Sequence, residues 1–140
     1  VPRQKAQDKL YFVDPVVANL THLRNSEWTI SEPTALVEQQ IGVSLRRRIE
    51  VDTPGRWAEH DQVYYFRTPS RKEIDFVSKY LVHIAIEGKY TQTGNWLGEA
   101  RTVNASPFMG LLATRNVLDT GAEERAWAVP AAFLAYLIDT

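Results

Sequence analysis

Three short strand-like runs near the middle of the chain constrain its fold more than any other feature. They are rich in β-branched and aromatic residues and comprise Val63–Arg67, Glu73–Val77 and Val82–Lys89. The second and third runs are joined through only a few residues around Leu81, so we expect them to pair as a hairpin. The sequence therefore predicts an antiparallel meander within a larger sheet.

Helical patterns surround this meander. Asp14-Pro15 has the form of a helix start and predicts a short helix over residues 14–23. Apolar residues at helical spacing predict a longer helix over residues 33–49. The later elements follow in the order helix, strand, strand, helix, over residues 96–104, 108–114, 125–129 and the segment from Pro130. This order predicts an α/β fold in which helices flank a mixed sheet, with residues 63–140 as the sheet core.

The length and the residues that are missing narrow the class of protein. The 140 residues suit one domain with its own core, so we expect residues 1–140 to form a single domain. The absence of cysteine excludes a disulfide scaffold, a thiolate zinc site and a cysteine nucleophile, and it fits a cytoplasmic location. No apolar run approaches the ~20 residues that span a bilayer, so we expect no membrane contact. Because the chain begins at Val1 without an initiator Met, we expect a module cut from a longer protein.

The net charge of −1 leaves no overall field that would attract nucleic acid, so any attraction has to come from a local patch. Arg67 and Arg71 lie beside the central hairpin, and Arg46–Arg48 lie in the last turn of the predicted helix 33–49. They could contact phosphates. We favour solvated strand-end charges for the first pair and an interaction with the helix dipole for the second group.

Asp75, Glu87 and Lys89 are the residues that could carry chemistry. Side chains alternate along a strand, so Glu87 and Lys89 share a face, and a tight turn near Leu81 places Asp75 opposite Glu87. Facing carboxylates repel unless a cation lies between them, and Mg²⁺ prefers such oxygen ligands. A nearby lysine could orient the attacking water or stabilise charge developing on phosphorus. Glu38, at the edge of the buried stripe of its helix, could join the site directly or through water.

A purely structural interpretation remains open at this point. The same register places Glu73 opposite Lys89, where they could form an ordinary cross-strand ion pair, and the carboxylates could lie on a solvated face. His83 shares the face of Glu87 and could act as a base, although a lone strand histidine is more often structural. We interpret His60 as part of a polar turn, and the tryptophans as core or core-edge residues: Trp28, Trp57, Trp96 and Trp127.

The run Val63–Val77, followed by Ile84-Ala-Ile-Glu-Gly-Lys-Tyr90, resembles a known family. It is similar to the C-terminal domain of unknown function attached to many prokaryotic AAA-type P-loop ATPases. Weaker similarity extends to the segments Lys9–Pro15, Glu38–Ile41 and Ala126–Pro130. The chain departs from the family pattern at Gly88, where a valine is usual between the glutamate and the lysine, and at Val16, where a glycine is usual.

The resemblance implies a restriction-endonuclease-like fold of the PD-(D/E)xK type. Carried over by position, Asp75, Glu87 and Glu38 would be metal ligands for Mg²⁺ or Mn²⁺, and Lys89 would be the catalytic lysine. The resemblance also implies a tethered P-loop ATPase domain in the full-length protein. The phosphate-binding pattern G-x-x-x-x-G-K-[ST] is absent from this chain, so we expect no ATP site here.

Two functions from different classes follow. One is a metal-dependent phosphodiesterase that acts on DNA or RNA, which the intact acidic set with its lysine favours. The other is a catalytically inactive module that regulates a tethered ATPase by binding nucleic acid, a partner protein or a second copy of itself. The near-neutral charge favours this second function, because a nuclease acting alone usually needs a basic cleft. We take the nuclease-like domain as the working hypothesis.

Overall fold

The computed structural model describes most of the chain from Pro33 onward and a few residues before it. The described residues are 11, 12, 14, 17, 33–55, 63–78, 81, 83–91, 96–121 and 125–140. The predicted helix over 14–23 therefore lies outside the described residues except at Asp14 and Val17. His60, Trp28 and Trp57 lie outside them as well.

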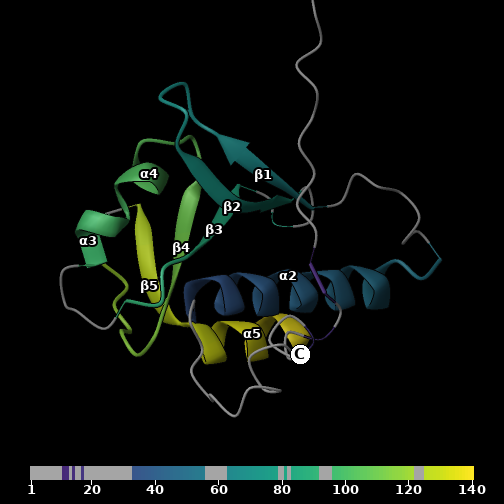
Figure 1. Cartoon of the computed structure of the whole chain (residues 1–140). Coiled ribbons are helices and arrows are strands. Elements are labelled where there is room, and N and C mark those ends of the chain that lie inside the picture. The colour runs from purple at the N-terminus through teal and green to yellow at the C-terminus, as the bar shows by residue number, and fades with distance from the viewer. Residues whose placement is uncertain are drawn as a thin grey trace, which may run out of the picture.

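The described residues form a five-stranded mixed sheet whose strands lie side by side in chain order (Figure 1). The strands are β1 Val63–Arg67, β2 Glu73–Ser78, β3 Ile84–Gly88, β4 Met109–Thr114 and β5 Ala126–Pro130. β1, β2 and β3 are antiparallel neighbours, which confirms the predicted meander. β3, β4 and β5 run parallel, so their carboxyl ends meet at one edge of the sheet.

Helices cover both faces of this sheet. On one face, α2 (Pro33–Asp52) and α5 (Ala131–Asp139) pack against each other and against the sheet (Figure 1). On the other face lie two short helices, α3 (Trp96–Glu99) and α4 (Arg101–Asn104). Each face has its own apolar core, with Leu45 and Leu134 in the first and Trp96 and Val103 in the second. The predicted α/β architecture, a mixed sheet flanked by helices, is confirmed.

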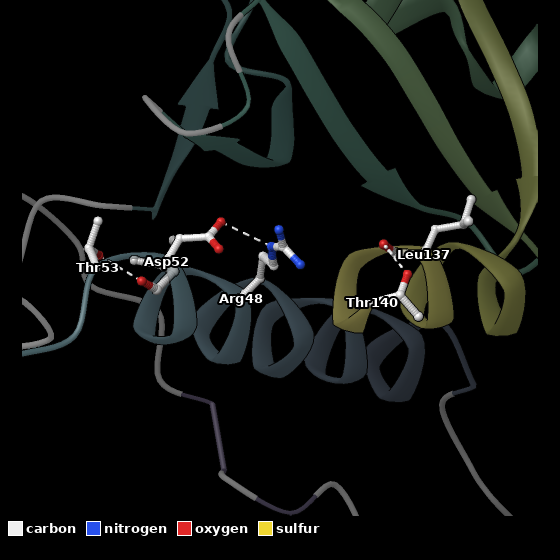
Figure 2. A network of polar contacts seen from close by, with 6 residues as sticks. Arg48, Asp52, Thr53, Leu137 and Thr140 are labelled. Carbon is white, nitrogen blue, oxygen red and sulfur yellow. Dashed lines mark hydrogen bonds and ion pairs between the residues drawn. The ribbon is translucent and has the colours of Figure 1, made fainter.

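The helix that was predicted to end near residue 49 continues to Asp52. Arg48 Nε lies 3.0 Å from Asp52 Oδ2, one turn further on, and this pair holds the additional turn (Figure 2). Thr53 Oγ1 donates to the carbonyl of Ile49 at 2.6 Å and closes the end. Arg46–Arg48 therefore lie before the last turn, and at Arg48 the partner is a carboxylate rather than the helix dipole alone. None of the helices among the described residues has the length and apolar character needed to cross a bilayer.

The segment predicted as one helix over residues 96–104 is two helices that meet at Ala100. Ala100 has ψ near zero, at −4°, which tightens the chain between them. Gly98 and the β-branched Val103 are poorer helix formers than alanine or leucine, so little in this short segment favours a single straight helix. The break lets both Trp96 and Val103 reach the same core.

Candidate active site at the carboxyl end of β3

Glu87 and Lys89 form an ion pair where β3 ends. Glu87 Oε1 lies 2.9 Å from Lys89 Nζ. The Glu87 side chain is only 3% exposed, whereas that of Lys89 is 34% exposed, so the lysine connects a buried carboxylate to the surface. Glu87 lies two residues after Ala85, which packs in the core beneath α3 and α4, so the alternation of the strand directs Glu87 to that face.

Asp75 lies beside this pair on the neighbouring strand. β2 and β3 pair at Phe76↔Ile86. The next position in this register places Asp75 opposite Glu87, as was predicted from the position of the turn. Asp75 Oδ2 accepts a hydrogen bond from the backbone N–H of Gly88 at 2.9 Å, which fixes the aspartate against the end of β3. The structure therefore brings Asp75, Glu87 and Lys89 together.

An irregularity in β2 helps to place Asp75. Tyr64 pairs with Val77 and Phe66 with Ile74, so one residue of β1 stands opposite both Asp75 and Phe76, as in a β-bulge. Two buried residues of β2 consequently face different cores even though they are only two positions apart. Ile74 packs in the α3–α4 core and Phe76 in the α2–α5 core.

The electrostatics of the three groups are coupled. Burial raises the pKa of the Glu87 carboxyl, while the hydrogen bond and charge of Lys89 oppose that rise and the charges of Asp75 and Glu99 add to it. Burial alone would lower the pKa of Lys89, but its hydrogen bond to Glu87 and the surrounding carboxylates outweigh burial, so the pKa is raised. Lys89 consequently stays positively charged at neutral pH.

The second carboxylate oxygen of Glu87 is the least satisfied group of the site. Glu87 Oε2 is buried and has no hydrogen-bond partner within the described part of the chain. An ionised oxygen withdrawn from water without a partner costs several kcal/mol, roughly, so such an atom suits a cation or a proton. The donor set of Asp75 and Glu87, two hard carboxylates, fits Mg²⁺ or Mn²⁺.

Glu38 approaches the same end of β3 from α2. A Cβ built on Gly88 would lie 3.5 to 3.6 Å from the backbone and Cβ of Glu38, so Gly88 faces α2 whereas its neighbour Glu87 faces the other side of the sheet. Glu38 Oε1 accepts a hydrogen bond from the Tyr11 hydroxyl at 2.7 Å. Within the described ranges, no three acidic, histidine or cysteine side chains are grouped closely enough to hold a metal. The structure thus does not bring Glu38 into one cluster with Asp75 and Glu87.

The structure contains neither the cross-strand ion pair expected between Glu73 and Lys89 nor a solvated carboxylate at Glu87. Glu73 pairs with Arg67, with Arg67 Nη2 and Glu73 Oε2 3.1 Å apart, and these residues are register partners. Lys89 instead reaches Glu87. His83 is not the strand residue predicted to share a face with Glu87: it is exposed and lies in a turn, with φ of 64°, just before the amino end of β3.

Glu99, at the end of α3, is the acidic residue that sequence reasoning missed. Its charge raises the pKa of both Glu87 and Lys89, so its carboxylate lies near the ion pair. The only signal in the sequence is its position on a short helix after β3, which becomes informative once that helix is known to cover the Glu87 face. Of the tryptophans expected in the core or at its edge, Trp96 is 2% exposed, and Trp127 is 39% exposed on the edge strand β5.

Comparisons of this chain with protein-family models, curated proteins and solved structures gave no match. What the chain does must therefore be argued from the geometry and chemistry of the residues themselves.

Proposed function

We propose that this chain is a restriction-endonuclease-like domain of the PD-(D/E)xK type that hydrolyses phosphodiester bonds of nucleic acid with the help of Mg²⁺ or Mn²⁺. The observation that carries the proposal is the buried Oε2 of Glu87, which has no hydrogen-bond partner among the described residues. The other oxygen, Oε1, lies 2.9 Å from the charged Lys89, and Asp75 lies beside the pair. A sheet that served only as a scaffold would gain stability from an apolar residue at this position. The order of helix, antiparallel meander and parallel strands supports the fold assignment.

The proposal assigns a role to each side chain. Asp75 and Glu87 would hold the metal, which when bound would supply Lewis-acid activation of water and of the phosphate oxygen. Lys89 would stabilise the negative charge that develops on the phosphate, because Glu87 fixes its ammonium group at the edge of the site. Glu38 is left out of this set, because it lies on the α2 side of the sheet, where Gly88 lets α2 approach β3, whereas Glu87 faces the other side.

A metal titration and a cleavage screen test the proposal together. Calorimetry with Mg²⁺ and Mn²⁺ should give saturable binding to the wild type that Asp75→Asn and Glu87→Gln abolish. Glu73→Gln removes another carboxylate of β2, the partner of Arg67, and this control variant should bind metal as the wild type does. Labelled single- and double-stranded DNA and RNA should then be cleaved only with metal, and Lys89→Met should reduce the rate about 100-fold or more.

Wild-type protein that neither binds metal at millimolar concentration nor cleaves any of these substrates would overturn the proposal. A rate that Glu87→Gln leaves unchanged would do so as well, because it would locate the activity elsewhere in the chain or in a contaminant.

A catalytically inactive interaction module that regulates a tethered ATPase is the second candidate. It is favoured by the apolar outer face of α5, where Phe133, Tyr136 and Leu137 are 48%, 63% and 50% exposed. These residues recur at helical spacing on the exposed part of α5, whereas Leu134 is buried against α2. If the metal experiments fail, Tyr136→Ser should weaken association with the ATPase part of the full-length protein, and Asp75→Asn should not.

A further inference from the structure

An aromatic residue and an arginine stand together immediately beside the candidate active site. Tyr90 directly follows Lys89, and Arg115 directly follows β4, the strand next to β3. The guanidinium carbon of Arg115 lies 5.9 Å from the centroid of the Tyr90 ring, within the range of a cation–π contact. Because β3 and β4 run parallel, both side chains project from the carboxyl edge that also carries Glu87 and Lys89.

The backbone fixes this pair in place. The N–H groups of Lys89 and Tyr90 both donate to the carbonyl of Ala113, at 3.0 and 3.1 Å, and Arg115 N donates to the carbonyl of Thr91 at 3.0 Å. Tyr90 has φ of 35°, in the left-handed region that costs a non-glycine residue conformational energy. The chain thus holds an aromatic residue in a costly conformation at the rim of the site, a kind of position that is frequent at functional sites.

A second basic residue stands on the other side of the site, at the tip of the β1–β2 hairpin. Arg71 is exposed and also has a positive φ, of 62°, at a turn position where glycine would be less costly. Hydrogen bonds from Arg71 N to Thr68 O at 2.9 Å and from Thr68 N to Lys72 O at 2.8 Å hold the tip closed. The pairing Arg67↔Glu73 places this tip at the same end of the sheet as Asp75.

We propose that Tyr90, Arg115 and Arg71 form a binding surface for single-stranded nucleic acid. This inference rests on the proposed function and names its substrate class. Tyr90 stacks on an unpaired base, and the two arginines hold phosphates on either side of Asp75, Glu87 and Lys89. Aromatic rings between cationic side chains are the usual way of binding single strands, because every base has a face on which a ring can stack.

The charge of the molecule favours a single strand over a duplex. Duplex DNA carries two phosphates in each 3.4 Å of its length, and proteins that bind it commonly contact six to ten of them, roughly. This chain has a net charge of −1, and the cations that the described residues place around the site include Arg71, Lys89 and Arg115. A short single strand needs fewer phosphate contacts, and stacking supplies the rest of the affinity.

Fluorescence anisotropy of a labelled oligonucleotide in EDTA measures this binding without cleavage. Tyr90→Leu should weaken binding of the single strand about tenfold, whereas Tyr90→Phe should bind as the wild type does, since both replacements bear the same backbone cost and only phenylalanine stacks. Arg115→Gln should make the plot of log affinity against log salt shallower by about 0.7, the value for one phosphate contact on a single strand. Tyr64→Leu and Arg125→Gln are matched controls, because both residues are exposed and lie at the opposite end of the sheet.

The inference is supported if the wild type prefers the single strand to a duplex of the same sequence, if Tyr90→Leu and Arg115→Gln weaken binding, and if Tyr90→Phe and the two control variants do not. It is overturned if Tyr90→Leu binds as tightly as the wild type, if the duplex binds more tightly, or if no nucleic acid binds. Its failure is separable from that of the proposed function. If cleavage depends on metal and Tyr90→Leu leaves its KM unchanged, only the inference about single-strand binding is overturned. If the protein binds single strands specifically but neither binds metal nor cleaves, only the proposed nuclease activity is overturned.

Discussion

The ion pair of Glu87 and Lys89 explains why Lys89 cannot be replaced without a structural cost. Removing the ammonium would leave a carboxylate that is 3% exposed without a positive partner. Breaking a buried pair costs about 3–5 kcal/mol, which we reduce to about 1–3 kcal/mol for Lys89→Met because the ammonium side remains partly solvated. Urea unfolding should show this loss of stability.

A double variant tests the explanation. Glu87→Met combined with Lys89→Met removes both charges, so it should recover most of the stability that Lys89→Met loses. Arg67→Met is the control, because it breaks an exposed pair with Glu73 and should cost less than about 1 kcal/mol. A double variant less stable than Lys89→Met would mean that Glu87 is held by contacts other than the lysine.

Asp119 gives the protein a predictable response to acid. Its carboxylate accepts hydrogen bonds from Gly121 N at 2.9 Å and from Trp96 Nε1 at 3.0 Å, and these bonds lower its pKa below the usual 3.8. A lowered folded-state pKa contributes stability that is present above pH 3.8 and is lost as the pH falls through the folded-state value.

Asp119→Asn should therefore be less stable than the wild type near neutral pH, and the two should converge as the pH falls below about 4. Thermal unfolding followed by tryptophan fluorescence measures the difference, since Trp96 is one of the partners. Trp96→Phe should remove part of the same pH dependence. A stability difference that stays constant between pH 7 and pH 3 would show that the charge of Asp119 is not what the folded state uses.

At the scale of the elements, α4 is locked against the sheet by the smallest residue of β4. A Cβ on Gly110 would lie 1.8 Å from Val103 Cγ1 and 2.9 Å from Val103 Cβ, so no side chain fits there unless α4 moves. Gly110→Ala should destabilise the fold by about 1–3 kcal/mol through overpacking, as measured by urea unfolding. Gly110→Ala with Val103→Ala should regain part of the loss.

Gly88→Ala is the matched control for this prediction. The added Cβ would meet Glu38 at 3.5 Å, an ordinary contact, so a stability change below about 1 kcal/mol is expected. Equal losses from the two glycine variants would mean that both positions respond to the alanine in the same way and that the contact with Val103 is not the cause.

The elements themselves were largely predictable from the sequence. Short runs rich in β-branched, aromatic and other apolar residues located the strands predicted over 63–67, 73–77 and 108–114 to within a residue or so of their bounds, because strands favour such residues. The length of α2 was underestimated, since its last turn depends on the pair of Arg48 and Asp52 rather than on apolar periodicity. The third strand starts two residues later than predicted, because His83 occupies a turn conformation that its identity does not reveal.

The candidate site was predictable only along the hairpin. Asp75, Glu87 and Lys89 follow from strand alternation and the position of one turn, which are local properties. Glu38 and Glu99 reach this end of the sheet from helices, so their placement depends on how α2 and α3 pack. The irregularity opposite Tyr65 also could not be read from the sequence, although it decides which face Ile74 and Phe76 occupy.

For the molecule as a whole, the near-neutral charge and the candidate site are compatible because the basic residues that matter are local. Arg71, Lys89 and Arg115 belong to one end of the sheet, while other charges pair among themselves, as Arg48 does with Asp52. A short-range patch of this kind acts within about one Debye length, ~8 Å at physiological salt, so it can hold a few phosphates of a single strand although the net charge is −1. Binding should therefore weaken as salt rises, with a contribution to the log–log slope of about 0.7 for each phosphate that Arg71 and Arg115 hold.

Metal binding by the native site should also stabilise the whole molecule. A ligand that binds only the folded state at one hundred times its Kd raises the free energy of unfolding by about 2.7 kcal/mol. Wild-type protein in saturating Mn²⁺ should show this rise in urea, and Asp75→Asn and Glu87→Gln should not. Glu38→Gln should show the same rise as the wild type, because Glu38 lies across the sheet from Glu87 and its carboxylate accepts a hydrogen bond from Tyr11. An equal rise in Asp75→Asn and the wild type would place the metal elsewhere, and the buried Oε2 of Glu87 would then be a proton site rather than a metal ligand.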